Sequence, residues 1–145
     1  IQCVVAPSDL YEFDTPYVKV LADPLTQCLS IRWKNYAPSG TYRSMLDTAV
    51  DLIRERGLRY FLSDQRQRDT ILHTDEVWLA MDWVPRMART GLERAAIVQS
   101  ADVFNSVAID RVVGTVQPGI VFPIRLFNTP EEAEAWLYSP ADVTS

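Results

Sequence analysis

One short stretch of the chain gathers the residue types that nucleophilic or acid–base chemistry would need. Ser63 and Asp64 end an apolar run, Arg66 follows them, and His73 is the only histidine in the chain. In a hydrolase, such a histidine would act as general base within hydrogen-bond reach of a nucleophile and an orienting acid. The sequence lacks the Gly-x-Ser-x-Gly turn that presents a serine nucleophile in one large enzyme class. We therefore expect His73 to be a solvent-facing loop residue and predict no catalytic residues, with an unrecognised hydrolase using Asp64, Arg66 and His73 as the weakest alternative.

Metal and cofactor signatures are missing from the sequence. One histidine and two cysteines, Cys3 and Cys28, cannot supply a usual zinc site, and their spacing predicts no redox motif or disulfide. Neither a Gly-x-Gly-x-x-Gly sequence nor a phosphate-binding loop occurs. The acidic pairs Asp75-Glu76 and Glu131-Glu132 stand where helices are expected to begin, so the helix dipole explains them better than a glycosidase-like carboxylate pair. We predict no metal and no cofactor, and we expect Cys28 to be a buried thiol in a reducing compartment.

Polar side chains follow three predicted strands and are better suited to binding than to catalysis. In open α/β sheets, ligands bind outside the carboxyl ends of the strands. The loops after Trp33, Asp64 and Gln99 place six candidate ligand- or partner-binding residues at that edge: Lys34, Tyr36, Ser39, Asp64, Arg66 and Ser100. The competing interpretation is structural, because a loop aspartate such as Asp64 commonly accepts hydrogen bonds from nearby amides and pairs with an arginine.

Charge and hydropathy argue against two further classes of function. Fourteen basic and 19 acidic residues give a net charge of −5, so the chain has no overall attraction for a phosphate backbone. Arginines gather between Arg54 and Arg68, but acidic residues alternate with them, which indicates a solvated surface of mixed sign and no nucleic-acid site. No apolar run reaches the length of a membrane-spanning helix, and we expect a cytoplasmic protein. The chain begins with Ile1 and not with Met, so a removed signal peptide is an open alternative.

Length and composition predict one globular domain. A chain of 145 residues that is 48% hydrophobic can form a core without disulfides or metals. The nine prolines are spread along the chain, so no linker divides it. We predict a single domain over residues 1–145, with loose ends at 1–9 and 139–145.

The hydrophobic pattern predicts an α/β fold with a mixed, mostly parallel sheet. Tyr17–Ala22 and Cys28–Trp33 are expected to form an antiparallel hairpin, preceded by a possible short strand at Leu10–Phe13. Period-two alternation in the second run indicates a half-covered sheet. Helices then alternate with three further strands, which implies right-handed crossovers; the strands are Leu58–Asp64, Ala95–Val98 and Ile120–Phe127.

Four helices are predicted from apolar residues spaced three and four apart. The first has Tyr42, Leu46 and Ile53 on one face and ends at Gly57 in a left-handed cap. On the third, the apolar face is expected to hold Phe104, Val107, Ala108, Arg111 and Val112. The expected first-turn caps are, in chain order, Ser39 or Thr41, Thr74, Ser100 or Asp102, and Thr129.

The second helix is apolar on two faces, which is more than one sheet would cover. We expect Pro85 to kink or break it near Trp83, and we expect Trp78 to face the sheet. That leaves a candidate interface at Leu79, Trp83 and Met87, to be covered by another helix, a homodimer partner or an apolar ligand. Ordinary packing inside the chain is the alternative.

Several of these segments together resemble a known family. The pattern runs through Trp33-Lys34-Asn35-Tyr36, Tyr42-Arg43, Leu62-Ser63-Asp64, Asp75-Glu76-Val77-Trp78-Leu79, Asp82-Trp83-Val84-Pro85, Gly91-Leu92, Ala96-Ile97-Val98, Phe127, Glu132-Ala133 and Trp136-Leu137. Over about residues 10–138 the chain resembles small bacterial proteins of the STAS superfamily, the anti-sigma-factor-antagonist-like domains of STAS/CRAL-TRIO type.

This resemblance implies a STAS-like sheet of four or five strands, with about four helices mainly on one face, and function through protein partners or small ligands. In sigma-factor antagonists a phosphorylatable serine or threonine follows the strand-end aspartate. Here Gln65-Arg66 follows Asp64, so a phosphorylation switch is not expected at this position.

The sequence therefore predicts a domain that acts by binding. The leading hypothesis is a non-enzymatic STAS-like protein-interaction or regulatory domain that binds a protein partner or forms a homodimer. The alternative is a carrier of a small apolar ligand or lipid, which requires an internal cavity beside the kinked helix.

Overall fold

The computed structural model describes residues 9–34, 37–68 and 71–140 and contains one six-stranded sheet. Its strands lie side by side in chain order: β1 (Tyr11–Asp14), β2 (Val18–Asp23), β3 (Cys28–Trp33), β4 (Tyr60–Asp64), β5 (Arg94–Val98) and β6 (Ile124–Phe127). The pairs β1–β2 and β2–β3 are antiparallel, whereas β3 to β6 run parallel. The predicted mixed α/β sheet with an N-terminal hairpin is confirmed. It has six strands because Tyr11–Asp14 adds an edge strand to the hairpin.

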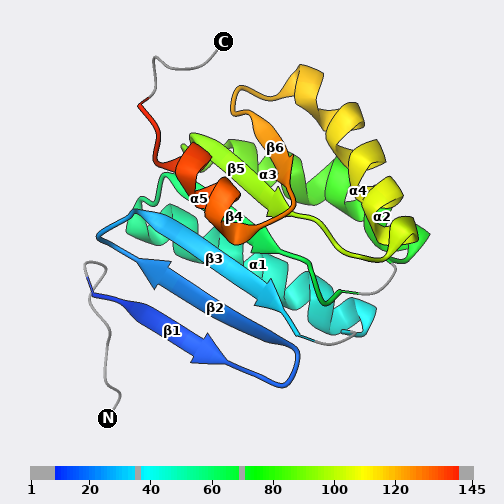
Figure 1. Cartoon of the computed structure of the whole chain (residues 1–145), viewed down its shortest axis with the longest axis horizontal. Coiled ribbons are helices and arrows are strands. Elements are labelled where there is room, and N and C mark those ends of the chain that lie inside the picture. The colour runs from blue at the N-terminus through cyan, green and yellow to red at the C-terminus, as the bar shows by residue number, and fades with distance from the viewer. Residues whose placement is uncertain (1–8, 35–36, 69–70, 141–145) are drawn as a thin grey trace.

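Helices cover the two faces of the sheet unequally (Figure 1). The larger layer contains α1 (Ser39–Arg56), α2 (His73–Trp78), a π-helix (Leu79–Trp83), α3 (Val84–Ala88) and α4 (Val103–Val116), which leads into a short 3-10 turn (Gln117–Gly119). Helix α5 (Pro130–Leu137) packs on the opposite face, where Ala133 and Leu137 contact a smaller apolar cluster that includes Cys28. Cys28 is buried, as predicted. Within the described part of the chain, no helix is long and apolar enough to cross a membrane.

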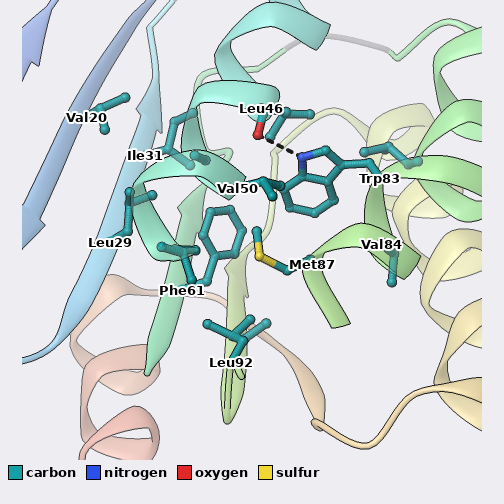
Figure 2. Packing of buried hydrophobic residues seen from close by; sticks show 14 of the residues in the cluster. Val20, Leu29, Ile31, Leu46, Val50, Phe61, Trp83, Val84, Met87 and Leu92 are labelled. Atoms are coloured by element: carbon teal, nitrogen blue, oxygen red, sulfur yellow. Dashed lines mark hydrogen bonds between the residues drawn. The ribbon is translucent and has the colours of Figure 1, made fainter. Parts of the chain in front are cut away.

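The main core lies between the sheet and the larger helical layer. Alternate residues of β3, namely Leu29, Ile31 and Trp33, enter this core, which confirms the predicted period-two pattern. The aromatic rings of Phe61 and Trp83 pack with centroids 5.6 Å apart (Figure 2). Burying side chains of this size contributes about 1.5–3 kcal/mol each, so these contacts account for much of the fold's cohesion.

Pro85 disturbs the helix where the sequence predicts a kink. The Val84 amide donates to the Leu79 carbonyl, so the turn that precedes Pro85 has π-helical hydrogen bonding. Proline lacks an amide hydrogen and cannot continue the regular α-helical ladder, which gives the change of pattern a local cause.

The two tryptophans of this segment are placed the other way round from the prediction: Trp83 is buried in the core, and Trp78 lies nearer the surface. Trp83 is only 7% exposed, and Leu79 and Met87 are buried with it. The three belong to the core and are covered by the chain itself, so the alternative of ordinary packing is confirmed and the candidate interface is wrong. Trp78, expected to face the sheet, is half-buried beside the guanidinium groups of Arg43 and Arg86.

Two buried acidic residues explain why the face with Leu79 and Trp83 points toward the core and the face with Trp78 does not. The Asp75 carboxylate is buried and accepts hydrogen bonds from Ser39 and Arg43 at 2.7 and 2.8 Å. Glu76 is also buried and pairs with Arg111. Residues three and four apart share a helix face, so holding positions 75 and 76 inward brings Leu79 inward too.

The helix termini follow the predictions in part. Pro38 stands at the N-cap of α1 and Leu72 at that of α2, so Ser39, Thr41 and Thr74 do not serve as caps there. The predicted termini that are confirmed are Asp102 on α4, Thr129 on α5 and the left-handed Gly57 after α1, with φ of 63°.

Candidate functional site

Asp64 and Arg66 form a pair at the carboxyl end of β4. The Asp64 carboxylate accepts from the Arg66 amide at 3.1 Å and from its guanidinium Nη2 at 2.8 Å. Asp64 thus has the structural role that the sequence offers as the alternative to ligand binding: it accepts from a nearby amide and pairs with an arginine. Together with Arg32 and Gln67, the pair borders a surface hollow of about 150 Å³.

The other described residues of the predicted edge are engaged in separate contacts. Lys34 pairs with Asp14 and donates to the Thr15 carbonyl at 3.0 Å. The Ser39 hydroxyl donates to Asp75, and the Ser100 hydroxyl donates to the Arg68 carbonyl at 2.6 Å. Tyr36 lies outside the described residues. Among those described, the structure brings only Asp64 and Arg66 into contact with each other.

No hydrogen bond or ion pair between described residues joins His73 to Ser63 or Asp64, the serine and aspartate that a hydrolase would need. Its side chain is 82% exposed, as expected, but His73 is the first residue of α2 and not a loop residue, and its Nδ1 is 4.0 Å from a Glu76 oxygen. Ser63 is buried, and its hydroxyl accepts a hydrogen bond from Gln65 at 3.3 Å. Over residues 9–34, 37–68 and 71–140, no three potential metal ligands cluster.

An apolar groove lies between α2 and α4, which are side by side in Figure 1. We call it the α2–α4 groove; it has a volume of about 360 Å³ and is lined by Ile71, His73, Glu76, Val103, Phe104, Val107, Ala108 and Arg111. Phe104 is 76% exposed, and Val103 and Val107 are exposed beside it. The predicted face of α4 is therefore partly wrong, because Ala108 and Val112 are buried whereas Phe104, Val107 and Arg111 are at the surface.

An ion pair fixes one side of this groove. Two Glu76 oxygens accept from Arg111 at 2.8 and 3.0 Å, so the pair is bidentate and joins α2 to α4. Hydrogen bonding from Arg111 lowers the pKa of the Glu76 carboxyl below its ordinary value. The pair thus links the two helices at this side of the groove.

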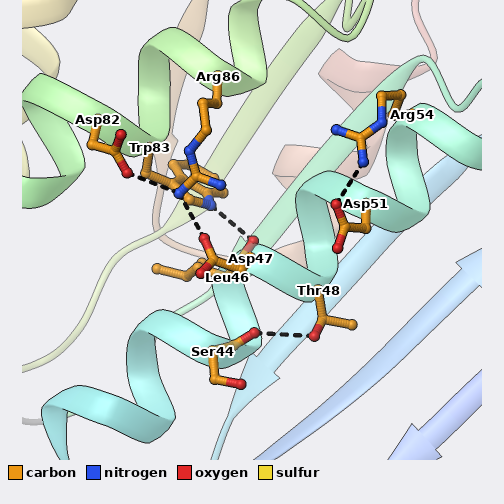
Figure 3. Close-up of polar contacts among 9 residues, drawn as sticks. All are labelled: Ser44, Leu46, Asp47, Thr48, Asp51, Arg54, Asp82, Trp83 and Arg86. Atoms are coloured by element: carbon orange, nitrogen blue, oxygen red, sulfur yellow. Dashed lines mark hydrogen bonds and ion pairs between the residues drawn. The ribbon is translucent and has the colours of Figure 1, made fainter.

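Arg86 connects the segment after the π-helix to α1. Its Nη2 atom is 2.6 Å from an Asp47 oxygen and 3.0 Å from an Asp82 oxygen (Figure 3). The neighbouring Trp83 indole donates to the Leu46 carbonyl on the same side of α1. These contacts anchor the helical segment that carries the buried tryptophan.

A buried polar cluster that the sequence does not predict lies where the loop after β4 meets α4; it contains Arg68 and Asn105. Arg68, which the charge pattern assigns to a solvated surface, is only 3% exposed. Its guanidinium carbon lies 4.1 Å from the Tyr42 ring centroid and 5.2 Å from that of Trp33. Burial raises the pKa of the Tyr42 hydroxyl, and the nearby Arg68 charge partly offsets this rise. No residue spacing in the sequence marks Arg68 as different from its exposed neighbours.

Three polar atoms of this cluster have no hydrogen-bond partner among the described residues. They are Nε and Nη1 of Arg68 and Oδ1 of Asn105. Asn105 is fully buried, and its Nδ2 donates to the Arg68 carbonyl at 3.4 Å, so the two residues are neighbours. Buried donors and acceptors are normally paired, which makes this cluster a second candidate site.

A small cavity lies between the sheet and the larger helical layer. Its volume is about 60 Å³, and its walls are mainly apolar, with Phe61, Trp83 and Met87 among them and Tyr42, Ser63 and Gln65 adding polar atoms. This is the position, beside the kinked helix, where the carrier hypothesis requires a cavity. An apolar cavity that takes up benzene has a volume of about 150 Å³, so this one is too small for a lipid chain.

Comparison with known proteins found no family model, no curated protein and no solved structure that matches this chain.

Proposed function

We propose that this chain is a non-enzymatic, STAS-like interaction domain that forms a homodimer through the α2–α4 groove. The observation that carries the proposal is the exposure of Phe104 at the edge of that groove. Trp83, the centre of the interface expected from the sequence, is buried within the chain. We therefore place the interface at the groove.

The exposed side chains of the groove favour a macromolecular contact. Phe104, Val103 and Val107 are exposed within one turn and a half of α4, and contiguous apolar surface of this kind marks interaction sites. Covering an aromatic or branched aliphatic side chain contributes about 1.5–3 kcal/mol, which three such residues would add to an association.

A second copy of the chain is the occupant that fits the groove best. A two-fold contact requires one surface to be complementary to itself. Here a projecting Phe104 stands beside a hollow that could receive the same residue of another copy.

Cysteine cross-linking tests this arrangement. In a Cys3→Ser background, Val107→Cys should form a covalent dimer with a short thiol cross-linker, because a two-fold contact brings the two copies of a central residue together. Leu25→Cys, which is 92% exposed in the β2–β3 loop on the other side of the molecule, is the matched control and should dimerise without forming the covalent cross-link. Equal cross-linking of both variants would contradict the proposal.

The carrier hypothesis is less well supported than the homodimer. The cavity beside the π-helix holds about 60 Å³, and a lipid tail would need the core to open. Extraction of the folded protein with organic solvent should therefore release no lipid. We assign the dimer to the cytoplasm because Cys28 is a free thiol, which is typical of a reducing compartment.

A further inference from the structure

The cavity between the sheet and the larger helical layer has a wall that is mainly apolar but carries a few buried polar side chains. Ser63 and Gln65 both line it, and both are buried. The Gln65 amide donates to the Ser63 hydroxyl at 3.3 Å, so the polar ends of these two side chains lie together. Tyr42 is a third buried polar residue of the wall, and none of the described lining residues is charged.

Two of these polar groups have hydrogen-bonding capacity that the described part of the chain leaves unused. The Gln65 Oε1 atom and the Tyr42 hydroxyl take part in no hydrogen bond between described residues. Neither is among the unpartnered side-chain atoms that lack accessible surface, so both remain within reach of a small molecule. Buried polar atoms are normally paired, which favours an occupant of the cavity that has a polar group of its own.

Water alone does not suit the rest of this cavity. The volume of about 60 Å³ would hold about four to six waters, since one water needs roughly 10–15 Å³. Each buried water needs about two to four polar partners, whereas Phe61, Trp83 and Met87, which lie close together in Figure 2, make their part of the wall apolar. A single molecule with one polar group and a short apolar tail meets both conditions.

One wall of the cavity belongs to the irregular part of the helical layer. Leu79 and Trp83 are the first and last residues of the π-helix, and Val84 follows it; all three line the cavity. Single π-helical turns occur frequently at functional sites. The position of this turn supports a binding role for the cavity.

We propose that this cavity binds a short-chain primary alcohol of about three to five carbons, whose hydroxyl donates to Gln65 Oε1 while its tail packs against the apolar wall. A neutral ligand fits because burying an unpaired charge among apolar side chains would be costly. The cavity shares no described lining residue with the α2–α4 groove, so alcohol binding does not depend on homodimerisation.

1-Butanol is the probe, and sodium butyrate, which has a similar tail but carries a charge, is the control. In NMR titrations of the wild type, butanol should bind saturably and give nuclear Overhauser effects from its methyl group to the rings of Phe61 and Trp83. Butyrate should bind at least about tenfold more weakly. Gln65→Met replaces the amide with an apolar group of similar size and should weaken butanol binding about five- to tenfold, as expected for the loss of one hydrogen bond. Gln67→Met, at an exposed residue outside the cavity wall, should bind butanol as the wild type does.

Three results would overturn the proposal. They are butyrate binding as tight as that of butanol, an unchanged affinity for butanol in Gln65→Met, and the absence of the Overhauser effects at the highest butanol concentration that leaves the protein folded. Signals from bound water in place of butanol would mean that solvent alone fills the cavity, and would overturn it too. If Gln65→Met does not fold, the Overhauser effects in the wild type and the comparison with butyrate decide the question.

Discussion

The indole nitrogen of Trp83 donates a hydrogen bond of 2.8 Å to the backbone carbonyl of Leu46 (Figure 2). Leu46 lies in α1, so this bond joins α1 to the segment that contains the π-helix. The same indole packs against Phe61 from the sheet. One side chain therefore connects three elements that are distant in the sequence.

Replacing this tryptophan should cost far more stability than replacing its neighbour in the same helix. Trp83→Ala removes a buried ring and a hydrogen bond, and should lower the free energy of unfolding by about 3–5 kcal/mol. Trp78→Ala removes a half-buried ring that packs on the edge of the core and beside the cations of Arg43 and Arg86, and should cost less, about 1–2 kcal/mol.

Urea denaturation followed by circular dichroism measures both changes. Trp83→Phe is the intermediate control, because it keeps a ring in the core and loses only the N–H donor and some volume. Similar losses for Trp78→Ala and Trp83→Ala would mean that the assignment of inner and outer faces is wrong.

The Glu76–Arg111 pair should make stability depend on acidity. Arg111 lowers the folded-state pKa of Glu76 below its unfolded value near 4.5. The pair therefore stabilises the protein above that pH, and this contribution is lost as the pH falls through the lowered folded-state value. Glu76→Gln should lower the free energy of unfolding at neutral pH, and this free energy should then fall less steeply in acid than it does in the wild type. The free energy of unfolding measured from neutral pH down to the acid limb tests this, and an unchanged acid limb in Glu76→Gln would contradict it.

The Cys28 thiol should resist modification in the folded protein. Burial raises its pKa to about 12, so almost no thiolate exists near neutral pH. In a Cys3→Ser background, Ellman's reagent should react with Cys28 only after denaturant is added. Rapid reaction under native conditions would mean that α5 does not stay packed over β3.

The order of strands and helices could be predicted from the sequence because each element carries its own pattern. Period-two alternation in Cys28–Trp33 and helical spacing from Tyr42 to Ile53 are local signals, and both elements form where they occur. The caps at Asp102 and Thr129 also follow from local chemistry, since each side chain accepts from amides within three residues.

The candidate site could not be predicted in this way, because distant contacts decide it. Trp78 and Trp83 lie on two faces of one helix that are both apolar, and the choice between them depends on Asp75 and Glu76 meeting Ser39, Arg43 and Arg111. Arg68 is buried against the rings of Tyr42 and Trp33, which come from α1 and β3 and pack with centroids 5.0 Å apart. The spacing of apolar and charged residues along the chain predicts neither of these contacts.

Sedimentation velocity over a range of concentrations tests homodimerisation through the α2–α4 groove. It gives the mass in solution of the wild-type protein and of Phe104→Asp. Aspartate in the first turn of α4 favours the helix, so the variant should fold, while its charge should prevent a second copy from packing against the groove. Leu25→Asp is the control at an exposed apolar residue away from the groove. We expect a dimer for the wild type and for Leu25→Asp, and a monomer for Phe104→Asp. A wild-type protein that stays at its monomer mass of 16.5 kDa, or a Phe104→Asp variant that dimerises as the wild type does, would contradict this expectation.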